Sequence, residues 1–218
     1  MNDVGRLHVL TDTVLQTRFS AVELARLAIR GGADVIQLRQ KDGATNQMID
    51  TARQLKAVCA GAGVDLIIND RLDVAMAVDA DGVHLGQDDF PINKARRMLG
   101  PGKVIGGSAD SLEEALQCQA DGADYVGFGP VFPTTSKDDA GPVAGLEALA
   151  RVAAGLRIPV VAIGGVNAGN AAQIMAAGAH GLAVISAVCC QLDPEAATTA
   201  LLRAMGLAAA PAAAARKG

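Results

Sequence analysis

The stretch DLIINDRLDVAMAVDADGVHLG, residues 65–86, contains two short apolar runs, each of which ends in polar or glycine residues. A segment with the apolar spacing of a helix separates the two runs. Near-continuous apolar runs are typical of parallel strands that are buried on both faces of a sheet. The stretch therefore predicts a strand, a helix and a second strand parallel to the first.

The same alternation extends in both directions over nearly the whole chain. The eight predicted strands are residues 7–12, 34–40, 65–70, 82–86, 104–109, 125–130, 159–165 and 181–187. Because right-handed crossovers join strands that alternate with helices, these strands should form one parallel sheet. Eight units without a linker favour closure over an open doubly wound sheet. We therefore predict an α/β fold, a single-domain (β/α)8 TIM barrel over residues 1–206.

The composition fits such a barrel and argues against several other classes. A chain of 218 residues, 50% hydrophobic and 2% aromatic, forms one domain with an aliphatic core. A net charge of −4 without a basic patch argues against nucleic acid as a partner. The chain has no run of about 18 apolar residues, so we expect no membrane span.

The termini and the cysteines bear on where the protein acts. The first residues contain no apolar run of signal-peptide length. The four cysteines form no CxxC pair and have no histidine at metal-ligand spacing, which predicts buried, reduced thiols in a cytoplasmic protein. Residues 207–218 are rich in alanine, and we expect them to form a disordered tail.

Two of the predicted helices begin with a capping box. Ser20 precedes Glu23, and Ser111 precedes Glu114, by three positions. At this spacing the serine side chain caps the helix, and the glutamate bonds back to the serine backbone. Both pairs therefore predict the first turn of a helix.

Active sites of parallel barrels form at the C-terminal ends of the strands, so the residues there are the candidates. Gln37, Arg39 and Lys41 end the second strand, and their alternation places them on one side of it. Cations on a barrel interior are costly to bury without an anionic partner. The three residues indicate a phosphate or diphosphate clamp, and an ion pair with a neighbouring aspartate is the alternative.

Carboxylates follow the next two strands. Asp70 comes directly after Asn69 at the end of the third strand, and Asp89 follows the fourth. Mg2+ prefers one or two carboxylates together with phosphate oxygens and water, so Asp70 and Asp89 are candidate Mg2+ ligands. Helix capping is the alternative for each aspartate, because a helix is predicted after each.

Three further features lie at or near the strand ends. His84 should face the barrel interior, either as a core histidine or in contact with a bound ring. Ser108 ends the fifth strand and can donate a hydrogen bond to phosphate. The connection over residues 131–144 carries hydroxyls and Lys137, which suits a lid over an anion, with a solvated polar loop as the alternative.

The last two strands end in residues that suit an anion. Gly164 and Gly165 allow backbone N–H groups to approach a ligand, and Ile185 and Ser186 end the eighth strand. Loops after the seventh and eighth strands recur as a phosphate site in this barrel class. The chain thus carries two predicted anion sites, which fits two phosphorylated substrates or one molecule phosphorylated at both ends.

Six motifs occur at these strand ends in the order QLRQK, IINDRLDVA, GVHLGQDD, ADYVGFGPVFPTTSK, VAIGGV and VISA. Together they resemble the thiamine phosphate synthase family over residues 7–205. The resemblance implies an enzyme that condenses 4-amino-2-methyl-5-(hydroxymethyl)pyrimidine diphosphate with 4-methyl-5-(hydroxyethyl)thiazole phosphate. The products would be thiamine phosphate and pyrophosphate, formed by a dissociative mechanism with Mg2+ as the cofactor.

The resemblance also implies a role for each matched residue. The pyrimidine diphosphate would be bound by Gln37, Arg39, Lys41, Asn69, His84, Ser108 and Lys137. The catalytic residues among them would be Arg39, Lys41, Ser108 and Lys137. The Mg2+ ligands would be Asp70 and Asp89. The thiazole phosphate would be bound by Thr134, Ser136, Gly165, Ile185 and Ser186.

Three residues depart from the family's pattern. Ser136 stands where threonine is usual, which keeps the hydroxyl. Asp110 stands where histidine is frequent, and we expect it to face outward or to cap the next helix. His8 stands where an aromatic residue, commonly tyrosine, is usual, which changes the stacking around the pyrimidine.

Alternatives to the synthase stay open on sequence alone. A thiazole tautomerase-like barrel needs a histidine near position 110, where this chain has Asp110. A sugar-phosphate isomerase or epimerase does not explain the carboxylate pair together with the loop lysine. A catalytically inactive phosphate-binding barrel stays open because of Asp110 and His8, and the carboxylate pair counts against it. The expected partners are two phosphorylated small molecules. Barrels of this type often self-associate, so a homo-oligomer is a further alternative.

Overall fold

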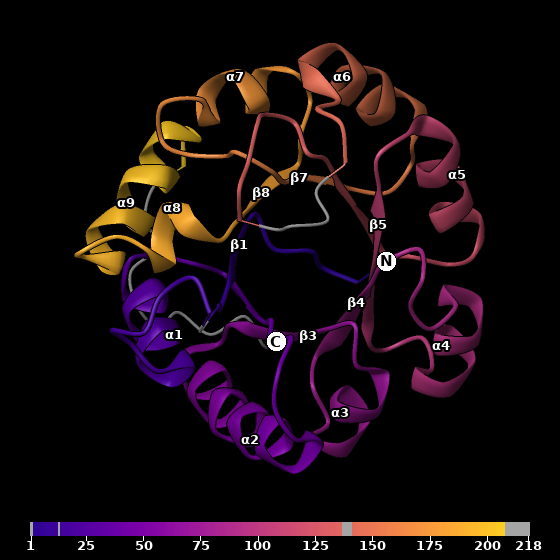
Figure 1. The fold of residues 1–218 in the computed structure, drawn as a ribbon. Helices are drawn as coiled ribbons and strands as arrows, with labels where there is room; N and C mark the ends of the chain where they lie inside the picture. Colours follow the sequence, from indigo (N-terminus) through magenta and orange to yellow (C-terminus); the bar gives the residue numbers. More distant parts are fainter. Residues whose placement is uncertain (1, 13, 137–140, 208–218) are drawn as a thin grey trace.

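The computed structural model describes residues 2–12, 14–136 and 141–207. It is a closed barrel of eight parallel strands with helices around the outside (Figure 1), which confirms the predicted (β/α)8 fold. The strands are β1 (Leu7–Leu10), β2 (Val35–Leu38), β3 (Asp65–Asn69), β4 (Gly82–Leu85), β5 (Val104–Ala109), β6 (Tyr125–Phe128), β7 (Val160–Ala162) and β8 (Gly181–Val184). The helices are α1 (Ala21–Arg30), α2 (Thr45–Ala62), α3 (Leu72–Ala77), α4 (Ile92–Leu99), α5 (Leu112–Ala120), α6 (Gly145–Gly155), α7 (Ala171–Ala176), α8 (Ser186–Cys189) and α9 (Pro194–Ala204).

Each strand pairs with its neighbour in the chain, and β8 closes the barrel on β1 through the pair Leu7 and Leu182. Every predicted strand contains an observed strand, although the observed strands are mostly shorter. The seventh ends early because Gly164 and Gly165 have φ values of 90° and 64°, outside the range of a strand. All strands run in parallel, so their C-terminal ends open at one end of the barrel.

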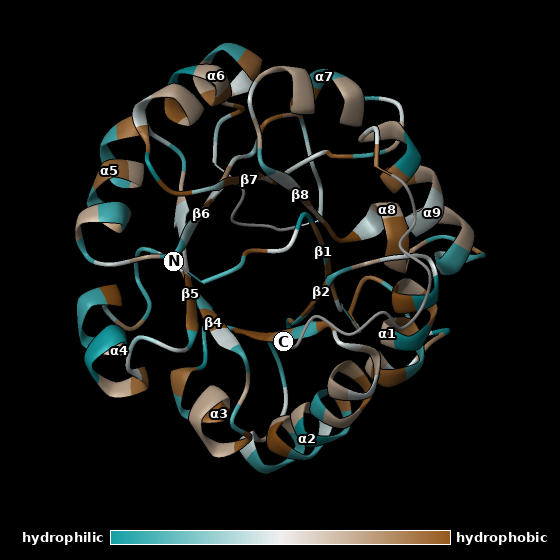
Figure 2. Ribbon diagram, turned by 180° about the vertical axis from the view of Figure 1, so that it is seen from behind, coloured by the Kyte–Doolittle hydropathy of each residue, from teal (hydrophilic) through white to brown (hydrophobic). Residues whose placement is uncertain are grey.

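Aliphatic side chains fill the space between the strands and the helices. On α1 the buried residues are Ala21, Leu24, Ala25 and Ala28. This i, i+3, i+4, i+7 spacing gives the helix one apolar stripe against the barrel. Figure 2 shows apolar strands at the centre and hydrophilic stretches on the surrounding helices. Each large buried side chain contributes about 1.5–3 kcal/mol, so the aliphatic core holds the strand ends in place.

The helix starts follow the predicted caps with one difference. Ser20 and Glu23 form a complete capping box. At α5 the Ser111 hydroxyl accepts from the backbone N of Glu114, as predicted. The Glu114 carboxylate, however, accepts from the backbone N of Asp110 at 2.9 Å, one residue before the expected serine. The second box therefore forms only in its serine half.

The cysteines are free thiols in the structure, as the sequence predicts. Cys59, Cys118 and Cys189 are buried, whereas Cys190 is only partly buried. Burial raises the pKa of the Cys59 thiol to about 12. Among the described helices, none has the length and apolar character to cross a bilayer.

Candidate active site

A cavity of about 760 Å3 opens at the C-terminal end of the barrel. It is lined by residues at or after the ends of seven of the eight strands, β2 to β8. The predicted site residues that line it are Lys41, Asn69, Asp70, Asp89, Ser108, Thr134, Ser136, Gly165, Ile185 and Ser186. Gln37, Arg39 and His84 lie at the same end of the barrel but are not among the lining residues. Lys137 falls outside the described residues.

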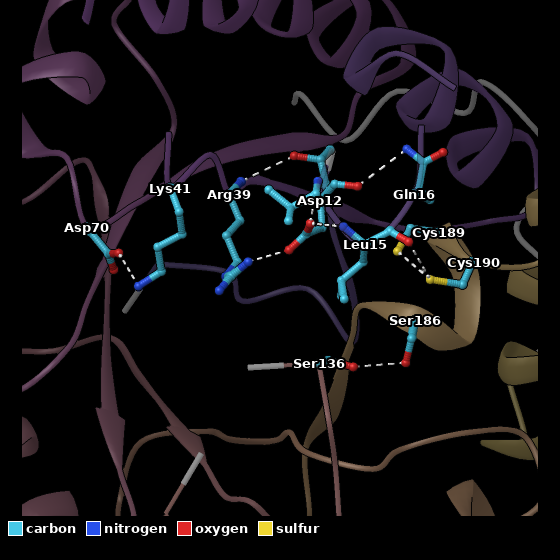
Figure 3. Close-up of polar contacts among 12 residues, drawn as sticks. Asp12, Leu15, Gln16, Arg39, Lys41, Asp70, Ser136, Ser186, Cys189 and Cys190 are labelled. Atoms are coloured by element: carbon cyan, nitrogen blue, oxygen red, sulfur yellow. Dashed lines mark hydrogen bonds and ion pairs between the residues drawn. The ribbon is translucent and has the colours of Figure 1, made fainter. Parts of the chain in front are cut away.

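Arg39 lies at the end of β2 and is 8% exposed. Its guanidinium forms an ion pair with Asp12, which follows β1, and its backbone N donates to the Thr11 hydroxyl at 3.2 Å (Figure 3). The buried Nε of Arg39 has no hydrogen-bond partner among the described residues. The ion pair with a neighbouring aspartate, which the sequence left open as the alternative, is therefore formed.

Asp12 also holds the start of the loop between β1 and α1. One carboxylate oxygen accepts from the backbone N of Val14 and of Leu15, each at 2.9 Å. The other oxygen accepts from Arg39, and Asp12 is 2% exposed. This aspartate fixes the position of Arg39, a predicted site residue, and sequence analysis did not single it out.

Lys41 and Asp70 face each other across the ends of β2 and β3 (Figure 3). The Lys41 Nζ lies 3.6 Å from Asp70 Oδ2, with both side chains partly exposed. Asp70 has a φ of 65°, an uncommon conformation that concentrates at functional sites. Its backbone N donates to the His84 carbonyl at 2.8 Å, which fixes the aspartate beside β4.

Asp89 turns back over the end of β4. Its Oδ2 accepts from the backbone N of Gly86 at 2.7 Å. Asp70 and Asp89 line the same cavity. Within the described residues, no cluster of three or more His, Cys, Asp or Glu side chains is arranged to hold a metal. Two carboxylates in one cavity nevertheless fit Mg2+, because this ion needs only one or two carboxylates and would take its other ligands from phosphate and water.

A chain of polar side chains lies beside the carboxylates, inside the barrel. His84 on β4 has its Nδ1 3.0 Å from the Tyr125 hydroxyl on β6 and its Nε2 2.9 Å from Ser108 Oγ on β5. The His8 ring packs edge-on against Tyr125, with 5.2 Å between the ring centroids. His84 thus faces inward, as predicted, and reaches the cavity through Ser108.

The loop after β6 is tied to the start of α8. The Ser136 hydroxyl bonds to the Ser186 hydroxyl at 3.0 Å (Figure 3). Thr134 Oγ1 accepts from the backbone N of Ser136 at 3.2 Å. Three residues predicted to hold one phosphate therefore lie together, although they come from two separate segments.

Backbone geometry shapes the cavity next to these hydroxyls. A Cβ on Gly165 would lie 2.6 Å from both Phe132 Cβ and Pro133 O, and the φ of Gly165 is 64°. Only glycine meets both conditions without strain. Ile185 and Ser186 begin α8, whose first N–H groups have no helical acceptor and carry partial positive charge. The described residues at this end of the cavity thus suit an anion through hydroxyls and backbone N–H groups.

Several cavity residues were missed by sequence analysis. Gln87 lines the cavity, and its Nε2 donates to the Ser108 carbonyl at 2.6 Å. Asp110 was expected to face outward or to cap α5, but it lines the cavity, and Ser111 caps the helix. Its position two residues after Ser108 is the available signal, because alternate residues of a strand share a side.

A parallel barrel with glycines, hydroxyls and a helix start after β7 and β8 and carboxylates after β3 and β4 is typical of (β/α)8 enzymes with phosphorylated ligands. Comparison with known proteins narrows this class. The family model described as thiamine monophosphate synthase matches residues 7–188. The chain belongs to this family.

Named relatives agree with the family match. A thiamine-phosphate synthase of Salinibacter ruber is 55% identical over 195 residues, covering 89% of this chain and 86% of that protein. A thiamine-phosphate synthase of Methanocella arvoryzae is 56% identical over 191 residues, covering 88% and 90%. The solved thiamine phosphate pyrophosphorylase of Pyrococcus furiosus superposes with a TM-score of 0.84 at 42% identity, covering 92% of this chain and 95% of that chain.

Proposed function

We propose that this enzyme joins the pyrimidine diphosphate and the thiazole phosphate to form thiamine phosphate and pyrophosphate. The observation that carries the proposal is a single cavity with two chemically different anion-binding ends. One end has Lys41 beside two carboxylates, which suits a diphosphate with Mg2+. The other has hydroxyls and backbone N–H groups, which suit a phosphate monoester.

At the diphosphate end, the chain's own groups would hold and neutralise the leaving group. Lys41, Asn69 and Ser108 line this part of the cavity as hydrogen-bond donors, and Arg39 has its unpartnered Nε nearby in the fold. Asp70 and Asp89 would hold Mg2+, which supplies positive charge to the departing pyrophosphate. Donors fixed before the reaction stabilise charge that develops in the transition state.

The bond changes need no protein nucleophile. The C–O bond between the pyrimidine methylene and the diphosphate breaks, and its electron pair leaves on the diphosphate oxygen. The thiazole nitrogen then donates its lone pair to the methylene carbon and forms the C–N bond. The chain contributes by holding both substrates in one cavity, since correct placement replaces a rare encounter in water.

At the thiazole end, the phosphate would accept from the hydroxyls of Ser136 and Ser186 and from the backbone N–H groups at the start of α8. The 3.0 Å bond between the two hydroxyls shows that they converge on one point. Gly165 keeps the backbone beside them open to a ligand. The thiazole ring would then extend from this point toward the pyrimidine carbon.

Release of pyrophosphate tests the proposal directly. Purified protein is mixed with both substrates, with either one alone, and with both in the presence of EDTA. We expect release only with both substrates and Mg2+, with thiamine phosphate as the organic product. Pyrophosphate release that persists in EDTA would contradict the metal assignment, and no thiamine phosphate under any condition would contradict the function.

The tautomerase-like alternative is not favoured by the structure. Asp110 stands in the cavity at the position where that chemistry needs a histidine. The carboxylate pair and Lys41, which a metal-free isomerisation does not require, line the same cavity. Incubating the protein with the thiazole isomer alone, and following its aromatisation by absorbance, separates the two activities.

A further inference from the structure

Three hydrogen-bonding side chains connect the barrel interior with the cavity. They are Tyr125, His84 and Ser108, and we refer to them as the Tyr125–His84–Ser108 chain. The Tyr125 hydroxyl lies 3.0 Å from His84 Nδ1, and His84 Nε2 lies 2.9 Å from Ser108 Oγ. Ser108 lines the cavity, so the chain ends where an anion would bind.

Tyr125, the residue of the chain that lies deepest in the barrel, determines which atom donates and which accepts in these hydrogen bonds. Tyr125 is 1% exposed, and burial raises the pKa of its hydroxyl, which therefore keeps its proton. A buried O–H group requires an acceptor. Among the described residues, the His84 Nδ1 is the one acceptor that hydrogen-bonds to this hydroxyl. Tyr125 therefore donates, and Nδ1 of His84 accepts on an unprotonated nitrogen.

The hydrogen bond from Tyr125 also fixes which nitrogen of His84 donates to Ser108. A neutral imidazole that accepts at one nitrogen donates from the other, so Nε2 of His84 carries the hydrogen. This N–H donates to Ser108 Oγ at 2.9 Å. The serine oxygen is thereby used as an acceptor, and its single hydrogen is directed away from His84. Since Ser108 lines the cavity, that hydrogen is available to an anionic oxygen there.

We propose that Tyr125 is a positioning residue that holds His84 in its Nε2–H tautomer and so makes Ser108 a hydrogen-bond donor to the bound diphosphate. The identity of the anion rests on the proposed function. The direction of the hydrogen bonds rests on the described contacts alone. Without the tyrosine hydroxyl, His84 could carry its hydrogen on either nitrogen. The Ser108 hydroxyl could then donate to His84 instead of to the anion.

Packing keeps the rings from adopting another arrangement. A Cβ on Gly106 would lie 2.2 Å from Tyr125 Cζ, and a Cβ on Gly127 would lie 2.9 Å from His84 Cε1. The rings thus occupy the space that two glycines leave open. On the far side, the His8 Nε2 bonds to the Gly5 carbonyl at 3.0 Å, and burial lowers the pKa of His8. A neutral His8 places no charge beside the tyrosine.

Nitrogen NMR of the imidazole rings tests the tautomer directly. In 15N-labelled protein at a pH of about 8, above the ordinary imidazole pKa, we expect His84 Nε2 to be protonated and Nδ1 to be bare. The His84→Gln variant identifies the signals by their loss. In Tyr125→Phe the two nitrogens should average toward mixed tautomers. A wild-type His84 with its hydrogen on Nδ1, or on both nitrogens, would overturn the proposal.

Binding of inorganic pyrophosphate with Mg2+, measured by calorimetry, tests the effect on Ser108. We expect Ser108→Ala to weaken binding about tenfold and Tyr125→Phe about threefold to fivefold. In the double variant Tyr125→Phe should add almost nothing, because its effect passes through Ser108. Additive losses of affinity in the double variant, or unchanged affinity in Tyr125→Phe, would contradict the proposed role of the Tyr125–His84–Ser108 chain. A wild-type protein that does not bind pyrophosphate would also contradict it.

A matched control separates this effect from loss of a buried hydroxyl. Thr198 on α9 is 0% exposed, and its hydroxyl donates to the Pro194 carbonyl at 2.7 Å, away from the cavity. Thr198→Val should lower the thermal midpoint about as much as Tyr125→Phe and leave pyrophosphate affinity unchanged. These measurements do not require turnover, so they test the Tyr125–His84–Ser108 chain separately from the proposed synthase activity.

Discussion

The two ends of the cavity are lined by different kinds of chemical group. The end at β2 to β5 uses charged side chains, of which Lys41 and Asp70 pair with each other. Arg39 and Asp12 form a second pair outside the cavity lining. The end at β6 to β8 uses glycine, two hydroxyls and the start of a short helix. The first depends on balanced charge, and the second depends on backbone shape. Substitutions should therefore affect the two substrates separately.

Removing charge from the proposed metal site should have the largest effect. In Asp70→Asn we expect kcat/KM to fall about a thousandfold, because several kcal/mol of charge stabilisation are lost. Asparagine tolerates the left-handed backbone of Asp70, so the fold should persist. Asp79→Asn is the control, since Asp79 also has a positive φ of 51° but is not among the cavity residues. Near-normal turnover in Asp70→Asn would remove the metal assignment.

A methyl group at the backbone end should act mainly on one substrate. For Gly165→Ala we expect the KM for thiazole phosphate to rise about thirtyfold, from roughly 2 kcal/mol of strain and displaced backbone. The KM for the pyrimidine diphosphate should change little. Gly63→Ala is the matched control, because Gly63 has a φ of 67° and no atom within 4 Å of the added Cβ. Equal changes for both substrates would break the division between the two ends.

Loss of one hydroxyl should have a smaller effect at the same end. Ser136→Ala removes the bond to Ser186 and should raise the KM for thiazole phosphate about threefold to tenfold. Ser136→Thr keeps the hydroxyl and should restore most of the affinity. Steady-state kinetics with each substrate varied in turn gives both values. A larger effect on the pyrimidine diphosphate would place Ser136 at the wrong end.

The last expected effect is on stability rather than on catalysis, and it concerns the buried His8. Burial lowers the pKa of His8, so the unfolded chain binds its proton first as the pH falls. Stability from His8 is therefore present above the unfolded pKa of about 6.5 and is lost below it, by at most about 1.4 kcal/mol per pH unit. Urea unfolding of wild type and His8→Phe at pH 7 and pH 5 measures the free energy of unfolding. An equal fall of this free energy in both proteins would show that His8 is not its cause.

The sequence predicts the strands well and the partners of their terminal residues less well. Apolar runs and alternation place Arg39 and His84 on the inner side of their strands, because these patterns depend on local geometry. The bond between Arg39 and Asp12 joins residues 27 positions apart, and it depends on the register of β1 and β2. The apolar pattern within a single strand does not show how that strand aligns with its neighbour.

Tyr125 shows the same limit more clearly. In the sequence it is one aromatic residue in a buried strand, where a core role is the ordinary interpretation. Its contact with His84 crosses from β6 over β5 to β4, where Gly106 pairs with both His84 and Tyr125. A hydrogen bond across an intervening strand is visible only after the barrel closes. The Glu114 carboxylate, which bonds one residue earlier than its capping motif predicts, is a smaller case.

The glycines at 106 and 127 have a consequence for anyone who redesigns this barrel. Gly127 lines the cavity and Gly106 is not among the lining residues, yet each supplies the volume into which a neighbouring ring fits. An engineer who fills that volume to strengthen the core would displace Tyr125 or His84 and change a hydrogen bond in the cavity. The absence of a side chain at two positions thus fixes where two rings lie, and a redesign of this part of the barrel has to treat four residues as one unit: Gly106, Gly127, His84 and Tyr125.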